Sequence, residues 1–230
     1  MITAPHDLRT IWRLFTSGNP LVRNVPFSFL LSTISDLSVS DSLDAEMCAA
    51  FTKSPTRGGA LFLGLCGSTT SITLLEGSLT NKNADVVEAI QMALARRGDK
   101  AYEELFIRRY VSHPIATNIT PSVAMDPSAD RVIASLSYIG SVDCIAALLD
   151  SAPAKEYVRN GLHLSTVSVF TMRKFLTEAG IAIPAPEASN DEKMIRWWRD
   201  NRQRIVLELR KRDRRTLPPL GYCGISTTCN

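Results

Sequence analysis

The stretch RGGALFLGLCGSTTSITLLEGSL, from Arg57 to Leu79, decides the fold. It holds a strongly apolar run, a glycine at position 67 and a second run whose apolar residues recur at helical spacing. The first apolar run, residues 60–66, is far shorter than the roughly 20 residues that a membrane span requires. The Lys-Ser/Thr pair of a phosphate-binding loop is absent. The stretch therefore predicts two helices separated by a glycine break, with Gly58 and Gly59 as positions of close helix packing.

The same pattern recurs twice further along the chain. LARRGDKAYEELFIRRY surrounds Gly98 and LSYIGSVDCIAALLDSA surrounds Gly140, so each glycine follows an apolar helix and precedes a small or acidic residue that can cap the next one. Gly67 and Gly98 are 31 residues apart, and Gly98 and Gly140 are 42 apart. These spacings are typical of helical repeats, with an insertion before the third copy. The aligned register predicts core positions at Leu74, Leu105 and Leu148.

The rest of the chain reads as helix, because apolar residues recur three and four positions apart and strand signals are scarce. The predicted helices are 7–16, 20–36, 43–53, 55–66, 69–79, 84–97, 100–112, 127–139, 142–151, 153–160, 166–179 and 191–213. Ser54-Pro55 is one of the pairs expected to start a helix. Gly98, Gly140 and Gly180 are expected to end helices in the left-handed conformation.

The glycine junctions resemble the HEAT-repeat family, in particular the short bacterial HEAT-like repeats that also occur in phycobilisome lyases. The best match is ADRVIASLSYIGSVDCIAALLDSA, residues 129–152. The family usually carries Asp after the turn glycine, as Asp99 does here. Ser68 and Ser141 depart from that pattern, although serine can cap the following helix equally well.

The resemblance implies an all-α fold, a right-handed α-solenoid of about five stacked antiparallel helix pairs, because one pair cannot bury its apolar face alone. We expect a single array over residues 1–213, with the clearest repeats at 55–152 and a tail at 214–230. EKMIRWWRDNRQRIVLELRKRDRR, residues 192–215, is the expected long, charged helix that caps the array.

Residues for catalysis or metal binding are not grouped in the sequence. His6, His113 and His163 are scattered, and none has a partner His or Cys at helical metal-ligand spacing. Cys48, Cys66 and Cys144 sit in apolar helical patterns and are expected as reduced core residues. Cys223 and Cys229 lie in a Gly/Ser/Thr-rich tail, where a disulfide is an open alternative. We therefore predict no catalytic residue, no metal site and no cofactor.

The paired carboxylates of Glu103 and Glu104 lie close in sequence to several arginines. Solvated ion pairs explain them more simply than acid–base chemistry.

The expected function is binding without chemistry, because a solenoid offers extended surfaces to a macromolecular partner. We predict a protein-binding adaptor, assembly factor or immunity (inhibitor) protein of bacterial HEAT-like type. The candidate partner-binding residues are Tyr102, Arg108, Arg109 and Tyr110, since Tyr and Arg are favoured anchors at interfaces, although some of them must pack between repeats. The 112–128 and 180–190 segments interrupt the helical rhythm and are further candidate contacts.

The alternative is a nucleic-acid-binding protein that uses the basic C-terminal helix, with Trp197 or Trp198 stacking on a base. Its candidate residues are Arg196, Arg199, Arg202, Arg210 and Arg214. Some HEAT-like arrays are DNA glycosylases, but those carry their Asp, Trp and Arg residues in central repeats, whereas Trp12, Trp197 and Trp198 here lie in terminal segments.

The net charge of +3, from 26 Lys and Arg against 23 Asp and Glu, is too modest to select between these partners. The opening MITAPHDLRTIWRLF carries charges where an export signal has an apolar core. We expect a cytoplasmic protein, with a periplasmic one as the alternative if a signal once preceded Met1.

Overall fold

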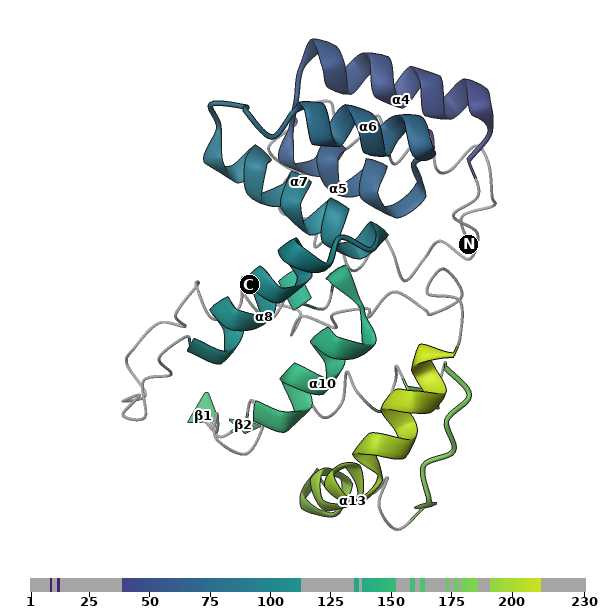
Figure 1. Cartoon of the computed structure of the whole chain (residues 1–230), viewed down its shortest axis with the longest axis vertical. Helices are drawn as coiled ribbons and strands as arrows, with labels where there is room; N and C mark the ends of the chain where they lie inside the picture. Colours follow the sequence, from purple (N-terminus) through teal and green to yellow (C-terminus); the bar gives the residue numbers. More distant parts are fainter. Residues whose placement is uncertain are drawn as a thin grey trace, which may run out of the picture. The chain divides into compact units, whose positions relative to one another are not determined.

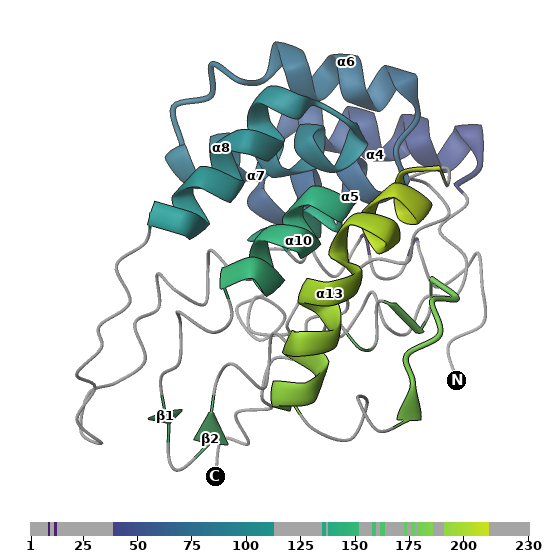
Figure 2. The same cartoon turned by 60° about the horizontal axis from the view of Figure 1, so that its bottom comes forward.

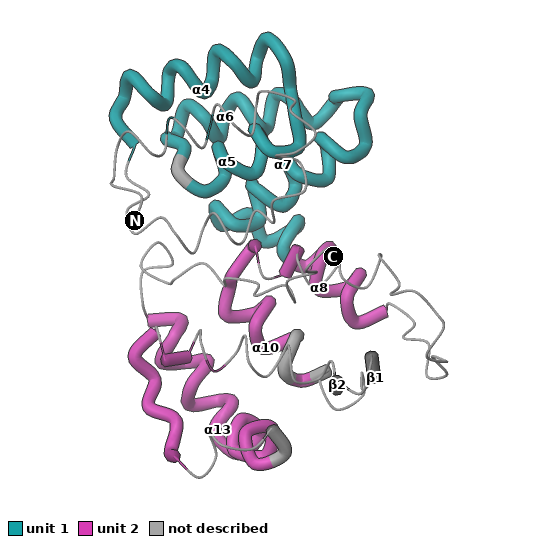
Figure 3. Tube along the Cα trace, turned by 180° about the vertical axis from the view of Figure 1, so that it is seen from behind, with its two compact units in different colours: residues 1–103 teal, residues 104–230 magenta. Residues whose placement is uncertain are grey.

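The computed structural model of the chain describes residues 39–112, 135–136, 138–151, 158–159, 162–163, 176–177, 179–185 and 191–211, together with Arg9, Trp12 and Arg173. These residues are predominantly helical, as the sequence predicts. The chain divides into two compact units, residues 1–103 and residues 104–230 (Figure 3). Each unit has buried apolar residues of its own.

Besides the helical residues Arg9 and Trp12, the described part of the first unit contains four helices and the start of a fifth (Figure 1). They are α4 (Asp41–Lys53), α5 (Arg57–Cys66), α6 (Thr69–Gly77), α7 (Ala84–Arg97) and the first residues of α8 (Lys100–Ser112). Helix α5 packs most closely against α7 and also contacts α4 and α6. The most apolar helix of the unit therefore lies between its neighbours.

This central position explains the apolar run in the opening stretch. Residues 60–65 are all buried, which is expected of a helix that is hydrophobic on every side. The indole of Trp12 meets the Phe62 ring edge-on, with 5.6 Å between ring centroids. A Cβ at Gly59 would lie 3.0 Å from the Phe51 ring, so Gly59 is a position of close packing, as predicted.

Short polar side chains begin the helices. The side chains of Ser40, Thr56, Ser68, Asn83, Asp99 and Ser141 each accept a hydrogen bond from a backbone N–H two or three residues further on. Three of these residues follow the junction glycines directly, so the predicted caps at Ser68, Asp99 and Ser141 are confirmed. The prediction at Ser54-Pro55 is wrong: α4 ends at Lys53 with Ser54 as its C-cap, and Thr56 caps α5.

Glycines end the helices in two different ways. Gly98, Gly140 and Gly180 have φ values of 117°, 62° and 71°, which confirms the predicted left-handed ends. Gly67 instead has an extended backbone with φ −70° and ψ 155°. A Cβ there would lie 2.4 Å from the carbonyl oxygen of Leu63, so Gly67 is required for space and not for its φ.

The second unit is built around two helices that lie beside one another, α10 (Val142–Ser151) and α13 (Asp191–Arg210) (Figure 2). Their buried side chains form one cluster with residues from the segment between them. The cluster contains Val142, Ile145 and Ala146 from α10, Leu176, Ala179 and Ile181, and Met194, Trp198, Ile205, Val206 and Leu209 from α13. Ile181 is thus a core residue, whereas residues 113–128 of the other predicted contact segment lie outside the described part of the chain.

A short β pair corrects the helix predicted over 153–160 at residues 158–159, while residues 153–157 and 160 lie outside the described residues. Val158–Arg159 (β1) pairs antiparallel with Leu162–His163 (β2), with Val158 opposite His163. The two residues between the strands in sequence are Asn160 and Gly161, the dipeptide that most favours a two-residue hairpin turn.

Predicted helices 7–16 and 20–36 and the tail 214–230 fall almost wholly outside the described residues, as do Cys223 and Cys229. The arrangement of about five helix pairs in a single solenoid over residues 1–213 stays a prediction. Leu74 and Leu105 are half-buried, whereas their neighbours Leu75 and Phe106 are fully buried.

Candidate functional site

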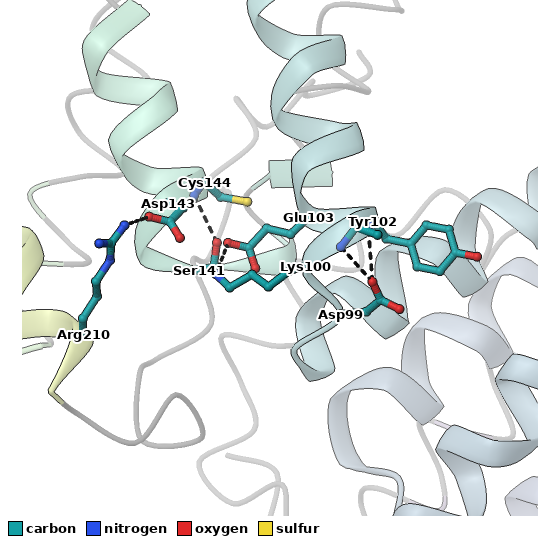
Figure 4. Close-up of polar contacts among 9 residues, drawn as sticks. Asp99, Lys100, Tyr102, Glu103, Ser141, Asp143, Cys144 and Arg210 are labelled. Carbon is teal, nitrogen blue, oxygen red and sulfur yellow. Dashed lines mark hydrogen bonds and ion pairs between the residues drawn. The ribbon is translucent and has the colours of Figure 1, made fainter.

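Helix α8 carries the four predicted partner-binding residues on different faces. Asp99 begins the helix by accepting hydrogen bonds from Ala101 N and Tyr102 N, at 2.9 and 3.2 Å (Figure 4). Tyr110 is 3% exposed, so it belongs to the buried face and is one of the residues that pack inward. Tyr102 is half-buried. Only Arg108 and Arg109 of the four are fully on the surface.

The two arginines have an exposed apolar neighbour that sequence reasoning missed. Val111 is 59% exposed, one of two large hydrophobic side chains among the described residues that are so placed. The guanidinium of Arg109 lies over the ring of Phe106, 5.2 Å from its centroid, which restricts that cation to one side of the helix. We call Arg108, Arg109 and Val111 the α8 patch.

Helix α13 carries most of the residues that the alternative function expects to bind nucleic acid. Its aromatic side chains do not lie on the exposed face: Trp198 is 1% exposed and Trp197 packs against the core cluster of the second unit. The indole Nε1–H of Trp198 donates to Asp150 Oδ1 at 3.1 Å. Stacking of the Trp198 ring on a base, as the alternative function expects, would require the core to open, whereas Trp197 is half-buried.

Two of the α13 arginines are held by carboxylates of α10. The Arg202 guanidinium forms a two-pronged contact with Asp150, with Nε 2.9 Å from each carboxylate oxygen, and this hydrogen bonding raises the pKa of Arg202. Arg210 pairs with Asp143 (Figure 4). Arg196 and Arg199 are exposed. Arg214 lies outside the described residues.

The sequence predicts solvated ion pairs for the adjacent carboxylates Glu103 and Glu104 of α8, and Glu103 differs from that prediction. The side chain of Glu103 is 1% exposed and pairs with Lys100 at 3.1 Å, so it is not a solvated partner of a neighbouring arginine. Glu104 is exposed. The two adjacent carboxylates therefore lie in different environments and do not form one site.

The structure also reveals a buried carboxylate that the sequence did not single out. Asp44 of α4 is 8% exposed and accepts hydrogen bonds from the hydroxyls of Ser68 and Ser71, both at 2.6 Å, and from the Ser68 N–H at 3.2 Å. Burial by itself raises the pKa of Asp44, but these hydrogen bonds and the charge of Arg97 together hold the pKa below its ordinary value.

The hydrogen bonds extend from this carboxylate to a thiol. Ser71 has a single hydroxyl hydrogen, which it donates to Asp44. The 3.2 Å contact between Cys48 Sγ and Ser71 Oγ therefore has the thiol as donor. Ser71 is fully buried, so its hydroxyl is closed to a substrate, and we assign the cluster to joining α4 with α6.

The described part of the chain was also compared with the predictions for metal ligands and cysteines. Among those residues no group of three or more His, Cys, Asp or Glu side chains could hold a metal ion. Cys48 and Cys144 are free thiols, and Cys144 is buried as predicted. His6 and His113 lie outside the described residues, as do the side chains of Cys66 and His163.

No helix among the described residues is both long and apolar enough to span a membrane. Comparison of the chain with protein-family models, curated proteins and solved structures gives no match.

Proposed function

We propose that this chain is a non-enzymatic helical scaffold that binds another protein through the α8 patch, as an adaptor, assembly factor or inhibitor does. The observation that carries the proposal is the exposure of Arg108, Arg109 and Val111 on a helix that buries Phe106 and Tyr110. A surface of this kind combines an apolar contact with two cations on a well-formed helix. Arginine is among the residues most enriched at the centres of interfaces.

The fixed position of Arg109 supports binding at this patch. Its contact with the Phe106 ring restricts the side chain before a partner arrives, so less rotamer entropy is lost on binding. The cations favour a partner whose contacting surface carries carboxylates. The HEAT-like architecture would place this helix in a central repeat, and we retain it as the proposed fold because the caps after Gly67, Gly98 and Gly140 follow one pattern.

Nucleic-acid binding by α13 is the second candidate, favoured by the exposure of Arg196 and Arg199. It has less support, because Trp198 is buried and Arg202 and Arg210 are already paired with α10. Base excision, as in the DNA glycosylases with HEAT-like arrays, would also need an exposed aromatic residue near a carboxylate. The three tryptophans are either buried or packed on a core.

The test is affinity capture from the native cell lysate, at low and high salt, with and without nuclease. We expect a stoichiometric protein that survives nuclease treatment and is lost with the double variant R108E/R109E. The matched control is K53E/K82E, which makes the same change in net charge at two exposed lysines of the first unit.

If both double variants lost the captured protein equally, its binding would depend on overall charge, and the proposal that it binds the α8 patch would be contradicted. Recovery of nucleic acid alone, released by salt, would move the function to α13, because phosphate contacts weaken steeply as salt rises. Circular dichroism of each variant should match the unmodified protein, since all four substituted residues are exposed.

A further inference from the structure

A single stripe of exposed residues runs along α13, opposite its buried face. At 100° per residue, Arg196, Arg199, Gln203, Leu207 and Lys211 follow one another along one side of the helix. Met194, Trp198, Ile205 and Leu209 lie on the other side, inside the core cluster. All five members of the first set are exposed, and Leu207 is 59% exposed. We call this set the α13 stripe.

The charges of the stripe are concentrated at its ends. Arg196 and Arg199 lie toward the start of α13, Lys211 lies just past its last residue, and the centre is the uncharged pair Gln203 and Leu207. The span from the first to the last member is about 22 Å along the helix axis. Asp200 is also exposed on this side of the helix, and against the three cations of the stripe it leaves positive charge in excess.

The neighbouring arginines of α13 are engaged differently. Arg202 and Arg210 pair with Asp150 and Asp143, and Arg204 hydrogen-bonds Asn201 and lies 3.9 Å from Glu208. Some cations of α13 therefore pair with carboxylates of α10, and Arg210 does so although it lies on the same side of the helix as the stripe. Sequence alone shows one continuous basic run, so these pairings are visible only in the structure.

We propose that the α13 stripe docks an acidic helical face of a partner protein, with carboxylates at both ends of that face and an apolar centre that receives Leu207. An apolar centre with a charged rim is the usual composition of a protein–protein interface. Packing of one helix beside another matches the length of the stripe. This surface lies on a different helix from the α8 patch and does not depend on it.

Two other occupants fit the stripe less well. A nucleic-acid strand carries a phosphate about every 3.4 Å, whereas the centre of the stripe has no cation, and the Trp198 ring that could stack on a base is buried. A lipid surface is bound by helices with a broad apolar face, and the apolar face of α13 lies in the core of its own unit. A single outward leucine does not replace that face.

The test uses the full chain and three labelled probes. One is a synthetic helical peptide with Glu at both ends and Leu in the centre, the second is the same peptide with Gln in place of Glu, and the third is a single-stranded DNA oligonucleotide of equal charge. Fluorescence anisotropy should show saturable binding of the acidic peptide, stronger than binding of the other two probes. R196E/R199E and L207S should each weaken it about tenfold, because both parts of the stripe are contacted.

The matched control is R204E, a charge reversal on the same helix but at the edge of the stripe. It should change the dissociation constant by no more than about twofold. Absence of saturable peptide binding, tighter binding of the DNA, or equal losses with R204E and R196E would each overturn the proposal. R108E/R109E separates the two surfaces: if only that variant abolished peptide binding, the α8 patch would be the peptide site and the α13 stripe would not.

Discussion

The hydroxyl of Ser71 on α6 donates to the carboxylate of Asp44 on α4 at 2.6 Å, across 27 residues of sequence. The same carboxylate receives the hydroxyl and the N–H of Ser68, the residue that caps α6. From the other side, the guanidinium of Arg97 donates to the carbonyl oxygen of Gly67 at 2.6 Å. The glycine junction is therefore held by a carboxylate from α4 and a cation from the end of α7, which links three helices of the first unit.

Replacing Asp44 with Asn should lower the free energy of unfolding by about 2 kcal/mol at neutral pH. Asn keeps the size of the side chain, but it loses the charge that strengthens the hydrogen bonds from Ser68 and Ser71, and its amide hydrogens face donors. Urea unfolding followed by circular dichroism would measure the loss. Asp41→Asn, at an exposed carboxylate on the same helix, is the control and should change stability by less than about 0.5 kcal/mol.

The contribution of Asp44 should also depend on pH in one direction. Its pKa in the folded protein is lower than the ordinary value of 3.8, because hydrogen bonds and Arg97 outweigh the opposing effect of burial. Folding therefore favours the ionised form, so the stabilisation is fully present above the ordinary pKa and is lost as pH falls through the lower, folded-state pKa. The difference in stability between the protein and D44N should shrink below about pH 4. A difference that stayed constant down to acid pH would contradict this account.

Replacing Gly67 and replacing Gly77 with alanine should have opposite effects on the free energy of unfolding. A Cβ at Gly67 would lie 2.4 Å from the Leu63 carbonyl oxygen and 2.5 Å from Ser71 Cβ, so the backbone of the junction must move. We expect a loss of about 1–3 kcal/mol. A Cβ at Gly77 would meet nothing within 4 Å, and alanine there should stabilise α6 by about 0.5 kcal/mol through the unfolded chain. Thermal unfolding of the two variants gives the comparison directly, and a stable G67A protein would disprove the steric argument.

Local signals made much of the helical structure predictable. The helices predicted at 84–97 and 100–112 occur with those bounds, because Asn83 and Asp99 cap them and Gly98 has the expected positive φ. The sequence also predicts the helix break at Gly67, but not its extended backbone. Its extended backbone depends on contacts with Leu63 and Ser71 that only the packed structure brings together.

The candidate sites were less predictable than the helices, because exposure depends on tertiary packing. Arg202 and Arg199 are alike in sequence, yet only the first faces a carboxylate 52 residues away. Tyr110 and Arg109 are adjacent, yet one is buried and the other exposed. Asp44 gave no sequence signal, because a carboxylate in an amphipathic helix usually faces solvent. The β pair at 158–159 and 162–163 was not predicted, because the sequence analysis used the spacing of apolar residues and did not consider Asn160-Gly161 as a turn signal.

Truncation of two adjacent leucines separates the predicted register from the observed one. The alignment of the junctions placed Leu74 in the core, but Leu75 is the fully buried residue and Leu74 is half-buried. Leu75→Ala should cost about 2–5 kcal/mol, and Leu74→Ala clearly less, because a half-buried site leaves a smaller cavity. Urea unfolding of both variants would show the order. Equal costs would indicate that the two positions share the core.

We expect the ion pair between Arg202 and Asp150 to contribute less to stability than the buried ring of Trp198. Arg202 and Asp150 are 42% and 40% exposed, so water screens their attraction, and Arg202→Ala should cost only about 0–1 kcal/mol. Trp198 is 1% exposed within the core cluster, and Trp198→Ala should cost about 3–5 kcal/mol.

Trp198→Phe keeps most of the ring but leaves Asp150 without the indole N–H, so an intermediate loss is expected. A double-mutant cycle between W198F and D150N isolates that hydrogen bond, because both single variants remove it while the apolar packing is largely kept. A coupling energy near zero would show that the hydrogen bond from Trp198 to Asp150 adds nothing to the stability that the apolar packing of the ring provides.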